Sequence, residues 1–539
     1  MTIKNMNSRI AIPIVTACLV FWVGFSSLSV FGQESLHARI DRLILERTGG
    51  EVSHKSSDAE FLRRVSLDFV SHIPSAKDAR SFIEDETPNK RQFLIDRLLA
   101  DDRYAIRMAD VFNVSLIERR SKHEEWINYL RSSFSSNKPW DDMVREIVAP
   151  DSDNEANRGA AFFYTARLER YGQNPPDVPG LVRDVGRMFL GVDVACAQCH
   201  DHLFINDYKQ VDYQGLYAFV GNTVLRQDVK FPAITENPLL TKVAFKSVFE
   251  GVEKMTGPRL PGGPEIEIPE QNQGEEFLIP PDKKIRAPGV LKFSPIRALS
   301  ESLTRSDKPE FSKNIANRLW WIMMGRGLVE PLDMHHSGNP ASHPELLDLL
   351  AREIVEHKFD IKWMLRELAL SDTYQRSSIQ PTDIAEPPLA ASYRTALERP
   401  LLSEQWITIL REVTGEATTD PKTLTEWQAR FDKIFANPPK EPELNVAPTV
   451  KAALFLSNDR VVLSWFDRKD GNLVDRLCKL DNTEAIVDEA YLSILTRLPT
   501  VVERTDMEHF LDKFKGPREK SIGQMAWALA ASTEFFVNH

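Results

Sequence analysis

Apolar residues recur at helical spacing over most of the chain, and this pattern limits the possible folds more than any other feature. From Leu36 to about Phe219 they return every three or four residues, as in Phe61, Val65 and Phe69. The same period resumes at Pro295 and continues almost to the end of the chain. Each such stretch can bury one face as an amphipathic helix. We therefore predict a mainly α protein.

Residues typical of helix N-termini predict where some of these helices begin. Ser75 reads as an N-cap because an acidic residue follows in the first turn. Ser342 reads as a stronger one, with Pro344 inside the first turn and Glu345 at the capping-box position. Further helices are predicted over residues 93–99, 182–192, 359–374, 486–495 and 522–536.

The middle of the chain differs from both flanks. Residues 222–293 hold many prolines and glycines, including the run at 261–264, between short β-like stretches such as Val243–Phe245 and Glu265–Ile268. We predict two helical domains, residues 33–221 and 295–539, flanking a strand-containing insert or linker over residues 222–294.

The first 32 residues have the pattern of a signal peptide. Lys4 and Arg9 precede an apolar run, and small residues near Gly32 suit a cleavage site. We expect export to the periplasm or cell envelope, with Gln33 as the first mature residue. The run could instead stay as a membrane anchor. Cys18 resembles a lipoprotein processing site, but the apolar residues after it make that interpretation weaker.

The net charge argues against a nucleic-acid-binding protein, and the number of cysteines argues against a disulfide-stapled scaffold. The formal charge of −11 at pH 7 argues against a nucleic-acid surface, because no excess of basic residues exists to release counterions. Of the four cysteines, Cys18 would leave with the signal peptide. The remaining odd number does not suit a disulfide-stapled scaffold, and Cys478 reads as a buried thiol.

The segment from Cys196 to His200 has the C-x-x-C-H spacing that attaches a c-type haem. In this interpretation Cys196 and Cys199 form thioethers with the haem, and His200 binds the iron as proximal ligand. Haem c is our leading prediction for the site. Met255, in a predicted loop, could offer a distal sulfur, although an ordinary loop residue explains it more simply.

Two other interpretations of the motif stay open. Cys196, Cys199 and His200 could hold a zinc or iron ion together with His202, which haem attachment does not use. Alternatively, Cys196 and Cys199 form a local disulfide in an oxidising compartment. The candidate residues are therefore Cys196, Cys199 and His200 for a cofactor, and His200 and His202 for a metal.

Other polar residues are weaker candidates. The adjacent His335 and His336 lie in a predicted loop and could supply a distant ligand, but solvated side chains are the simpler interpretation. Asn317, Arg318 and Arg326 suit either a buried polar network between helices or an anion site.

Several motifs together resemble a known family. The first half resembles the cytochrome-associated domain of unknown function that is abundant in planctomycete proteins, through Arg63-Arg64, Asp96-Arg97-Leu98-Leu99, Phe189-Leu190-Gly191 and the C-x-x-C-H-D-H motif. The second half resembles the domain that usually follows it, through Asn317-Arg318-Leu319-Trp320, Gly325-Arg326-Gly327-Leu328-Val329 and His343-Pro344-Glu345-Leu346. Many relatives carry a cytochrome c module ahead of these domains, whereas the mature chain here is expected to begin with the first helical domain. The resemblance implies an exported protein of uncharacterised activity.

Two classes of function follow from these observations. The first is an exported haem- or metal-binding protein that acts in redox reactions or binds an unknown protein partner. The second is a metal-dependent enzyme, for example a hydrolytic one. A non-catalytic binding protein with a local disulfide is the remaining alternative, and membrane contact is expected only if the N-terminal segment is retained.

Overall fold

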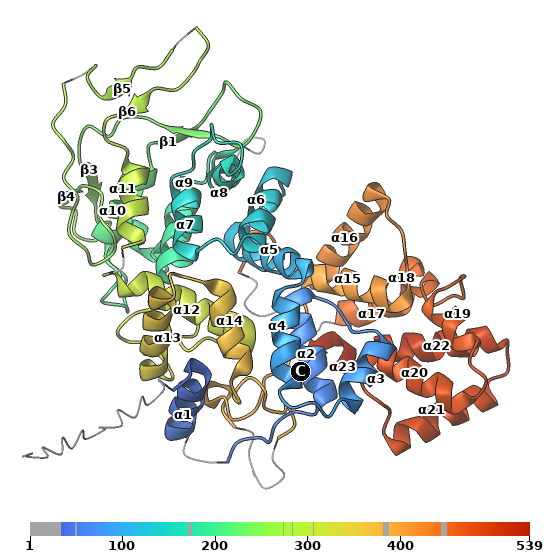
Figure 1. The fold of residues 1–539 in the computed structure, drawn as a ribbon. Coiled ribbons are helices and arrows are strands. Elements are labelled where there is room, and N and C mark those ends of the chain that lie inside the picture. The colour runs from blue at the N-terminus through green and yellow to red at the C-terminus, as the bar shows by residue number, and fades with distance from the viewer. Residues whose placement is uncertain are drawn as a thin grey trace, which may run out of the picture. The chain divides into compact units, whose positions relative to one another are not determined.

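The predicted helices are present in the computed structural model of the protein (Figure 1). It describes residues 34–48, 51–170, 175–272, 274–282, 284–305, 307–380, 388–442 and 450–539. Within these ranges lie 23 α-helices and four sheets of two strands each, so the protein is mainly α, as predicted. No helix in the described part of the chain is long and apolar enough to span a membrane. The predicted signal peptide, residues 1–32, lies outside the described residues.

The first half of the unit Leu36–His539 consists of short helices. Several begin where a side chain accepts a hydrogen bond from a backbone amide, among them the helix after Ser75, whose predicted capping role is confirmed. The bounds are α1 Leu36–Thr48, α2 Asp58–Val70, α3 Ala76–Glu84, α4 Lys90–Leu99, α5 Asp102–Ile117, α6 Glu124–Ser135, α7 Trp140–Val148, α8 Phe162–Leu168, α9 Val178–Val185 and α10 Gln210–Val220.

Residues 222–294 form three antiparallel hairpin-like pairs. β1 Thr223–Leu225 pairs with β2 Ile234–Glu236, β3 Val243–Lys246 with β4 Glu253–Thr256, and β5 Phe277–Ile279 with β6 Val290–Leu291. The strand predicted at residues 243–245 is confirmed, but Glu265–Ile268 forms none. Pro264 and Pro269 flank that segment and lack the N–H group that a strand ladder needs.

The second half returns to helices. The bounds are α11 Pro295–Leu303, α12 Pro309–Met324, α13 Pro344–Glu356, α14 Ile361–Leu370, α15 Ser403–Thr414, α16 Pro421–Phe435, α17 Val450–Asn458, α18 Arg460–Ser464, α19 Leu473–Cys478, α20 Thr483–Leu495, α21 Val501–Lys513, α22 Arg518–Ala530 and α23 Thr533–Phe536. The helix predicted over residues 522–536 is therefore divided between α22 and α23.

The predicted N-cap of α13 is wrong by one residue. His343 occupies the N-cap position, and its side chain makes no capping hydrogen bond. The hydroxyl of Ser342 lies 3.1 Å from Nδ1 of His343, and the backbone N–H of Ser342 donates to the carbonyl of Leu328 at 2.7 Å. Ser342 is therefore held in the preceding loop instead of capping the helix.

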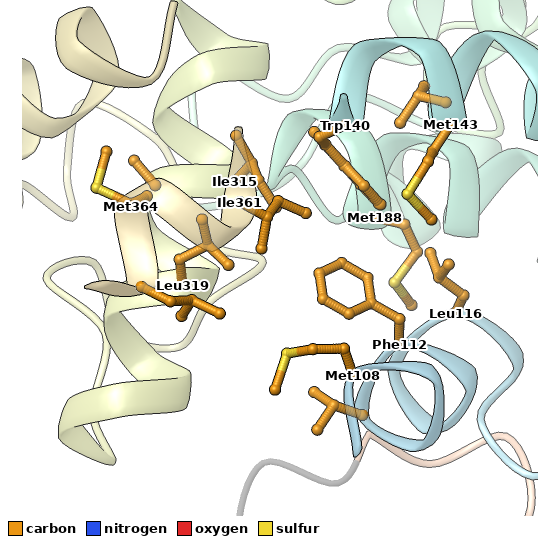
Figure 2. Packing of buried hydrophobic residues seen from close by; sticks show 14 of the residues in the cluster. Met108, Phe112, Leu116, Trp140, Met143, Met188, Ile315, Leu319, Ile361 and Met364 are labelled. Carbon is orange, nitrogen blue, oxygen red and sulfur yellow. The ribbon is translucent and has the colours of Figure 1, made fainter. Parts of the chain in front are cut away.

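The buried apolar side chains form two clusters. The first joins both halves of the chain: Phe112 on α5, Trp140 on α7 and Met188 lie in the same cluster as Ile315 on α12 and Met364 on α14 (Figure 2). The second is built mainly from helices α15 to α23. The predicted domain boundaries remain predictions, but the larger core extends across them.

A buried carboxylate ties the beginning of the chain to its end. Asp68 on α2 accepts hydrogen bonds from the Tyr374 hydroxyl, Arg399 Nη2 and Asn538 Nδ2, each at 2.7 Å. Arg399 and Asn538 are themselves paired, because β7 Arg399–Pro400 is antiparallel to β8 Val537–Asn538. Three segments that are far apart in sequence therefore meet at one side chain.

Candidate functional site

The C-x-x-C-H motif follows an abrupt turn of the chain. Helix α9 continues as a π-helical turn, η2 Gly186–Leu190, and ends at Gly191 with φ of +71°. A Cβ at Gly191 would lie 2.7 Å from Cδ2 of His335, so glycine is needed here for space as well as for backbone conformation. The helix predicted over residues 182–192 is thus confirmed only in part, since it changes its hydrogen-bond pattern at Gly186.

Both cysteines of the motif are free and exposed. Cys196 lies in the short 3-10 helix η3 Ala195–Gln198, and Cys199 follows directly after it. Backbone contacts hold this segment: the carbonyl of Cys199 accepts from the Val248 N–H at 3.1 Å, and the carbonyl of Gln198 accepts from the Gln210 side chain at 3.3 Å. The thiols are therefore presented to solvent from a backbone that is fixed on two sides.

The hydrogen bonds of His200 define its tautomer. Nδ1 lies 2.6 Å from the carbonyl oxygen of Asp201, which can only accept, so Nδ1 carries the proton. Nε2 then presents a lone pair, as in histidines whose orientation a backbone carbonyl fixes for metal binding. The imidazole also packs against Phe249, with ring centroids 4.8 Å apart. His200 is thus prepared to act as a ligand through Nε2.

His202 is used in a different way. Its Nδ1 accepts from the backbone N–H groups of Phe204 at 3.2 Å and Ile205 at 3.0 Å, so the neutral ring carries its proton on Nε2. The ring also lies edge-on to Tyr208. Among the described residues, no three His, Cys, Asp or Glu side chains converge as a metal-binding group. The side chain of His202 therefore stabilises the turn that follows it, through these two hydrogen bonds.

Large apolar side chains are exposed beside the motif. Phe204 is 89% exposed and Phe249 66%, and both contact histidines of the motif region. Leu203 and Val248, next to them in the sequence, are also exposed. Exposed apolar side chains therefore lie beside both His200 and His202.

A cavity of about 330 Å³ adjoins Cys199. Tyr213 and Tyr217 on α10 line it, together with Ala244 on β3. Met255 was predicted to lie in a loop, but it is in β4, opposite Ala244, and is exposed. The ladder between β3 and β4 accounts for the difference, because a four-residue pairing fixes this segment as a strand.

The loop histidines are less solvated than expected. His335 is partly buried beneath Gly191, whose carbonyl accepts from its backbone N–H at 3.0 Å. Burial lowers the pKa of His335 to about 4, so the ring is neutral at pH 7. His336 packs edge-on against Tyr208. The absence of a side chain at Gly191 makes room for the His335 ring and explains the difference.

Asn317 and Arg318 on α12 form polar contacts of the kind expected for a buried network, which was one of the two predicted alternatives. Asn317 is fully buried, and its side chain forms two hydrogen bonds with the backbone of Val329, at 2.9 and 3.0 Å. Arg318 donates to the carbonyl of Arg187 at 2.8 Å and to the carboxylate of Asp333. Nε of Arg326 has no hydrogen-bond partner among the described residues.

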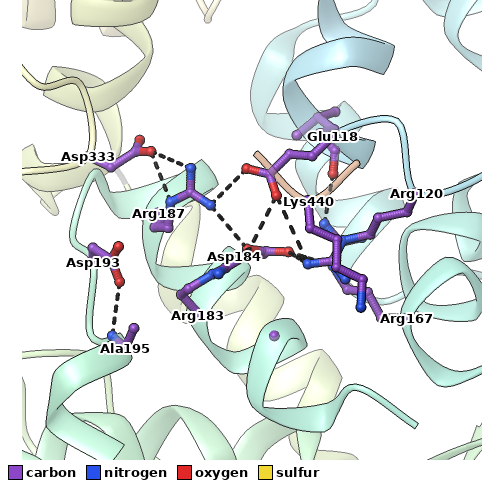
Figure 3. A network of polar contacts seen from close by, with 12 residues as sticks. Glu118, Arg120, Arg167, Arg183, Asp184, Arg187, Asp193, Ala195, Asp333 and Lys440 are labelled. Carbon is purple, nitrogen blue, oxygen red and sulfur yellow. Dashed lines mark hydrogen bonds and ion pairs between the residues drawn. The ribbon is translucent and has the colours of Figure 1, made fainter. Parts of the chain in front are cut away.

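A larger buried charge network was not found from the sequence (Figure 3). Arg187 donates to Asp333 at 2.8 and 2.9 Å and to Glu118 at 2.8 Å. Asp184, fully buried, accepts from Arg167 at 2.8 Å. Burial alone would raise the pKa of Asp184, but the surrounding guanidinium groups outweigh it and lower that pKa. The available signal was a group of three charged residues, Arg183, Asp184 and Arg187, within one turn of a mainly apolar helix.

The fold and these sites define a mainly helical protein whose two halves share a core and a buried charge network. The family PSCyt2, described as a protein of unknown function (DUF1549), matches residues 39–224, and PSD1, a protein of unknown function (DUF1553), matches residues 297–423. The chain therefore carries both domains in this order and belongs to the planctomycete-type family built from them. No curated protein and no solved structure matches the chain.

Proposed function

We propose that the protein is an exported carrier of covalently bound haem c, attached at Cys196, Cys199 and His200. The observation that supports this most is the hydrogen bond from Nδ1 of His200 to the Asp201 carbonyl, which leaves Nε2 available as a ligand. Both thiols beside it are exposed and unpaired. Bound haem would supply an iron centre that exchanges single electrons.

The surroundings of the motif also suit a large apolar cofactor. Phe249 packs against the His200 ring, and the backbone of Val248 is bonded to Cys199, so this turn and the motif lie together. Both side chains are exposed to water in the protein without cofactor. Covering apolar surface of this kind would contribute favourably to binding.

A zinc or iron ion, and with it a hydrolytic role, has weaker support. His202, the proposed additional ligand, uses Nδ1 to accept two backbone hydrogen bonds and so carries its proton on Nε2. Binding a metal through Nε2 would require those contacts to break. His200 has the opposite arrangement, which separates the two histidines chemically.

Export is the second part of the proposal. Lys4, Arg9 and the apolar run after them have the pattern of a signal peptide that ends at Gly32. N-terminal sequencing of protein from the envelope fraction should begin at Gln33. An intact Met1 on membrane-bound protein would establish a retained anchor instead.

The decisive experiment is the intact mass of the full chain made in a host that matures c-type cytochromes. We expect the polypeptide plus one haem, with a Soret band that survives denaturation. Cys199→Ala should leave at most one thioether, and His200→Ala should change the iron spectrum while a covalent link remains possible. His202→Ala is the matched control and should keep both the haem mass increment and the spectrum of the parent.

Other outcomes assign the motif differently. A mass equal to the bare chain with stoichiometric zinc or iron would establish a metal site, and His202→Ala should then lower the metal content. A mass two hydrogens lighter, without metal, would identify a disulfide between Cys196 and Cys199. Cys478→Ser removes the third thiol, so metal binding or a disulfide that persists in this variant does not involve Cys478.

A further inference from the structure

A second cavity, of about 310 Å³, lies away from the cysteine motif and between the two matched domains. One wall is a stripe along α5 that includes Arg107, Val111 and Ser115. These residues are four apart, so they share one face of the helix. The other walls come from the η2 turn, the end of α12, and β7 with the start of α15.

Most of the lining is apolar. Phe112, Leu116, Trp140 and Met188 gather on one side, and Figure 2 shows these side chains close together. Ile322 on α12 also lines the cavity. The polar part of the lining consists of arginines, the carboxylates of Glu118, Asp333 and Glu398, Ser115 and Gln405. A largely apolar space of this size, with polar groups at its edge, suits a small organic molecule.

Four arginines also line the cavity, and three of them are already paired. Arg187 and Arg318 donate to Asp333, and Arg399 donates to Asp68 at 2.7 Å. Each of these guanidinium groups therefore has a carboxylate that balances its charge.

Arg107 differs from the other three. It is only 8% exposed, and within the described part of the chain its one hydrogen bond runs from Nε to the backbone carbonyl of Asp68, at a long 3.4 Å. Its Nη1 has no partner among the described residues. Burial lowers the pKa of Arg107 to about 10, so the side chain remains charged at neutral pH. Asp68, Asp110 and Glu404 lie near enough to raise this pKa, but none of these carboxylates is hydrogen-bonded to Arg107 among the described residues. An anion at Nη1 would supply the hydrogen bond that this buried cation lacks.

We infer that this cavity binds a small amphiphilic carboxylic acid, with the carboxylate at Arg107 and the apolar chain along the wall formed by Phe112, Leu116 and Trp140. A guanidinium group and a carboxylate form charge-assisted hydrogen bonds, which are stronger than neutral ones and can be bidentate. The inference is independent of any cofactor at the cysteine motif.

The test is calorimetric titration of the full chain with octanoate and decanoate, followed in parallel by tryptophan fluorescence, since Trp140 and Trp321 line the cavity. We expect saturable binding of both acids and at least tenfold weaker binding of 1-octanol. Arg107→Gln should weaken octanoate binding about tenfold to a hundredfold, the range expected for hydrogen bonds to a charged group. Arg97→Gln, an exposed arginine on α4, is the matched control and should bind like the parent.

A second variant separates charge from space. Ser115→Phe keeps Arg107 but places a ring in the cavity, so it should abolish binding while the circular dichroism spectrum stays that of the parent. Absence of saturable binding of either acid to the parent would overturn the inference. Equal affinity for octanoate and 1-octanol, or an Arg107→Gln variant that is folded and binds octanoate normally, would also overturn it.

Discussion

In the described part of the chain, Asp184 is the carboxylate with the most arginine partners. Its carboxylate accepts from Arg167 at 2.8 Å, Arg183 at 2.9 Å and Arg120 at 3.1 Å, and it is fully buried. Removing its charge would leave guanidinium groups buried with fewer partners. Asp184 therefore stabilises the fold mainly because it keeps the buried guanidinium groups around it from being unpaired.

We expect Asp184→Asn to lower the free energy of unfolding by about 3–5 kcal/mol, measured by urea denaturation at pH 7. Asp512→Asn is the matched control: Asp512 is exposed on α21, and the change there should stay within about 0.5 kcal/mol. A loss below about 1 kcal/mol at Asp184 would show that water or neighbouring groups compensate the arginines.

His343 should make the free energy of unfolding depend on pH. Burial lowers its pKa to about 4, below the unfolded value of 6.5, and Nε2 has no hydrogen-bond partner among the described residues. The unfolded chain therefore binds the proton more tightly than the folded one. The contribution of the neutral His343 ring to the free energy of unfolding is complete above pH 6.5 and is lost as the pH falls toward 4.

Between pH 7 and 4.5 this single group should cost the parent about 2 kcal/mol of unfolding free energy. His343→Gln lacks the titration, so its stability should decline by that much less over the same interval. His509→Gln, at an exposed position of α21, is the matched control variant. Parallel profiles for the parent and His343→Gln would contradict the assignment.

At the residue scale the sequence located the cysteine motif but not the charge network. Cys196, Cys199 and His200 are adjacent in sequence, so their spacing alone indicated a common site. Arg187 and Asp333 are 146 positions apart, and neither stands in a recognisable motif. Such a pair becomes visible only when the packing of η2 against α12 is known.

At the scale of elements, the helix ends followed local chemistry where a cap was free to form. Ser75 caps α3 as predicted, whereas Ser342 was expected to cap α13 and instead lies in a loop bonded to Leu328. Apolar spacing predicted where helices occur, because burial of one face decides that. It did not predict the π-helical turn at Gly186 or the missing strand at Glu265–Ile268, where tertiary contacts and flanking prolines decide.

The capping box of α21 allows an element-scale test. Thr500 Oγ1 accepts from the Glu503 N–H at 3.3 Å, and Glu503 Oε2 accepts from the Thr500 N–H at 2.8 Å. Thr500→Ala should lower the free energy of unfolding by about 1 kcal/mol, measured by chemical denaturation. Thr505→Ala, inside the same helix and exposed, should be neutral or slightly stabilising, because alanine is the better helix former. Equal losses in both variants would remove the cap from the explanation.

At the scale of the whole molecule, the two matched domains do not have separate cores. Trp140 donates its backbone N–H to the Phe359 carbonyl at 3.1 Å, and Arg187 is paired with Asp333. These contacts link helical residues that precede residues 222–294 to the loops before α13 and α14 that follow them. The segment between them carries exposed apolar side chains, including Val248, Val252 and Leu278.

Limited proteolysis should therefore cut first between Asn222 and Phe293, yet the two fragments should stay together. We expect them to co-elute in gel filtration at the position of the intact chain and to separate only in denaturant. Early cleavage within residues 346–370, inside the buried helices α13 and α14, would argue against this. Fragments that elute separately without denaturant would show that the domains are autonomous.

The three hydrogen bonds to Asp68 cannot all form until the end of the chain has been synthesised. Asn538 lies 470 positions after Asp68, so at roughly 5–20 residues per second the ribosome delivers it on the order of a minute later. Until then the carboxylate must remain in water, because burial without its partners is costly. Helix α2 cannot reach its final environment while synthesis continues. This delay would suit the proposed export, because the early part of the chain could cross a membrane before it folds.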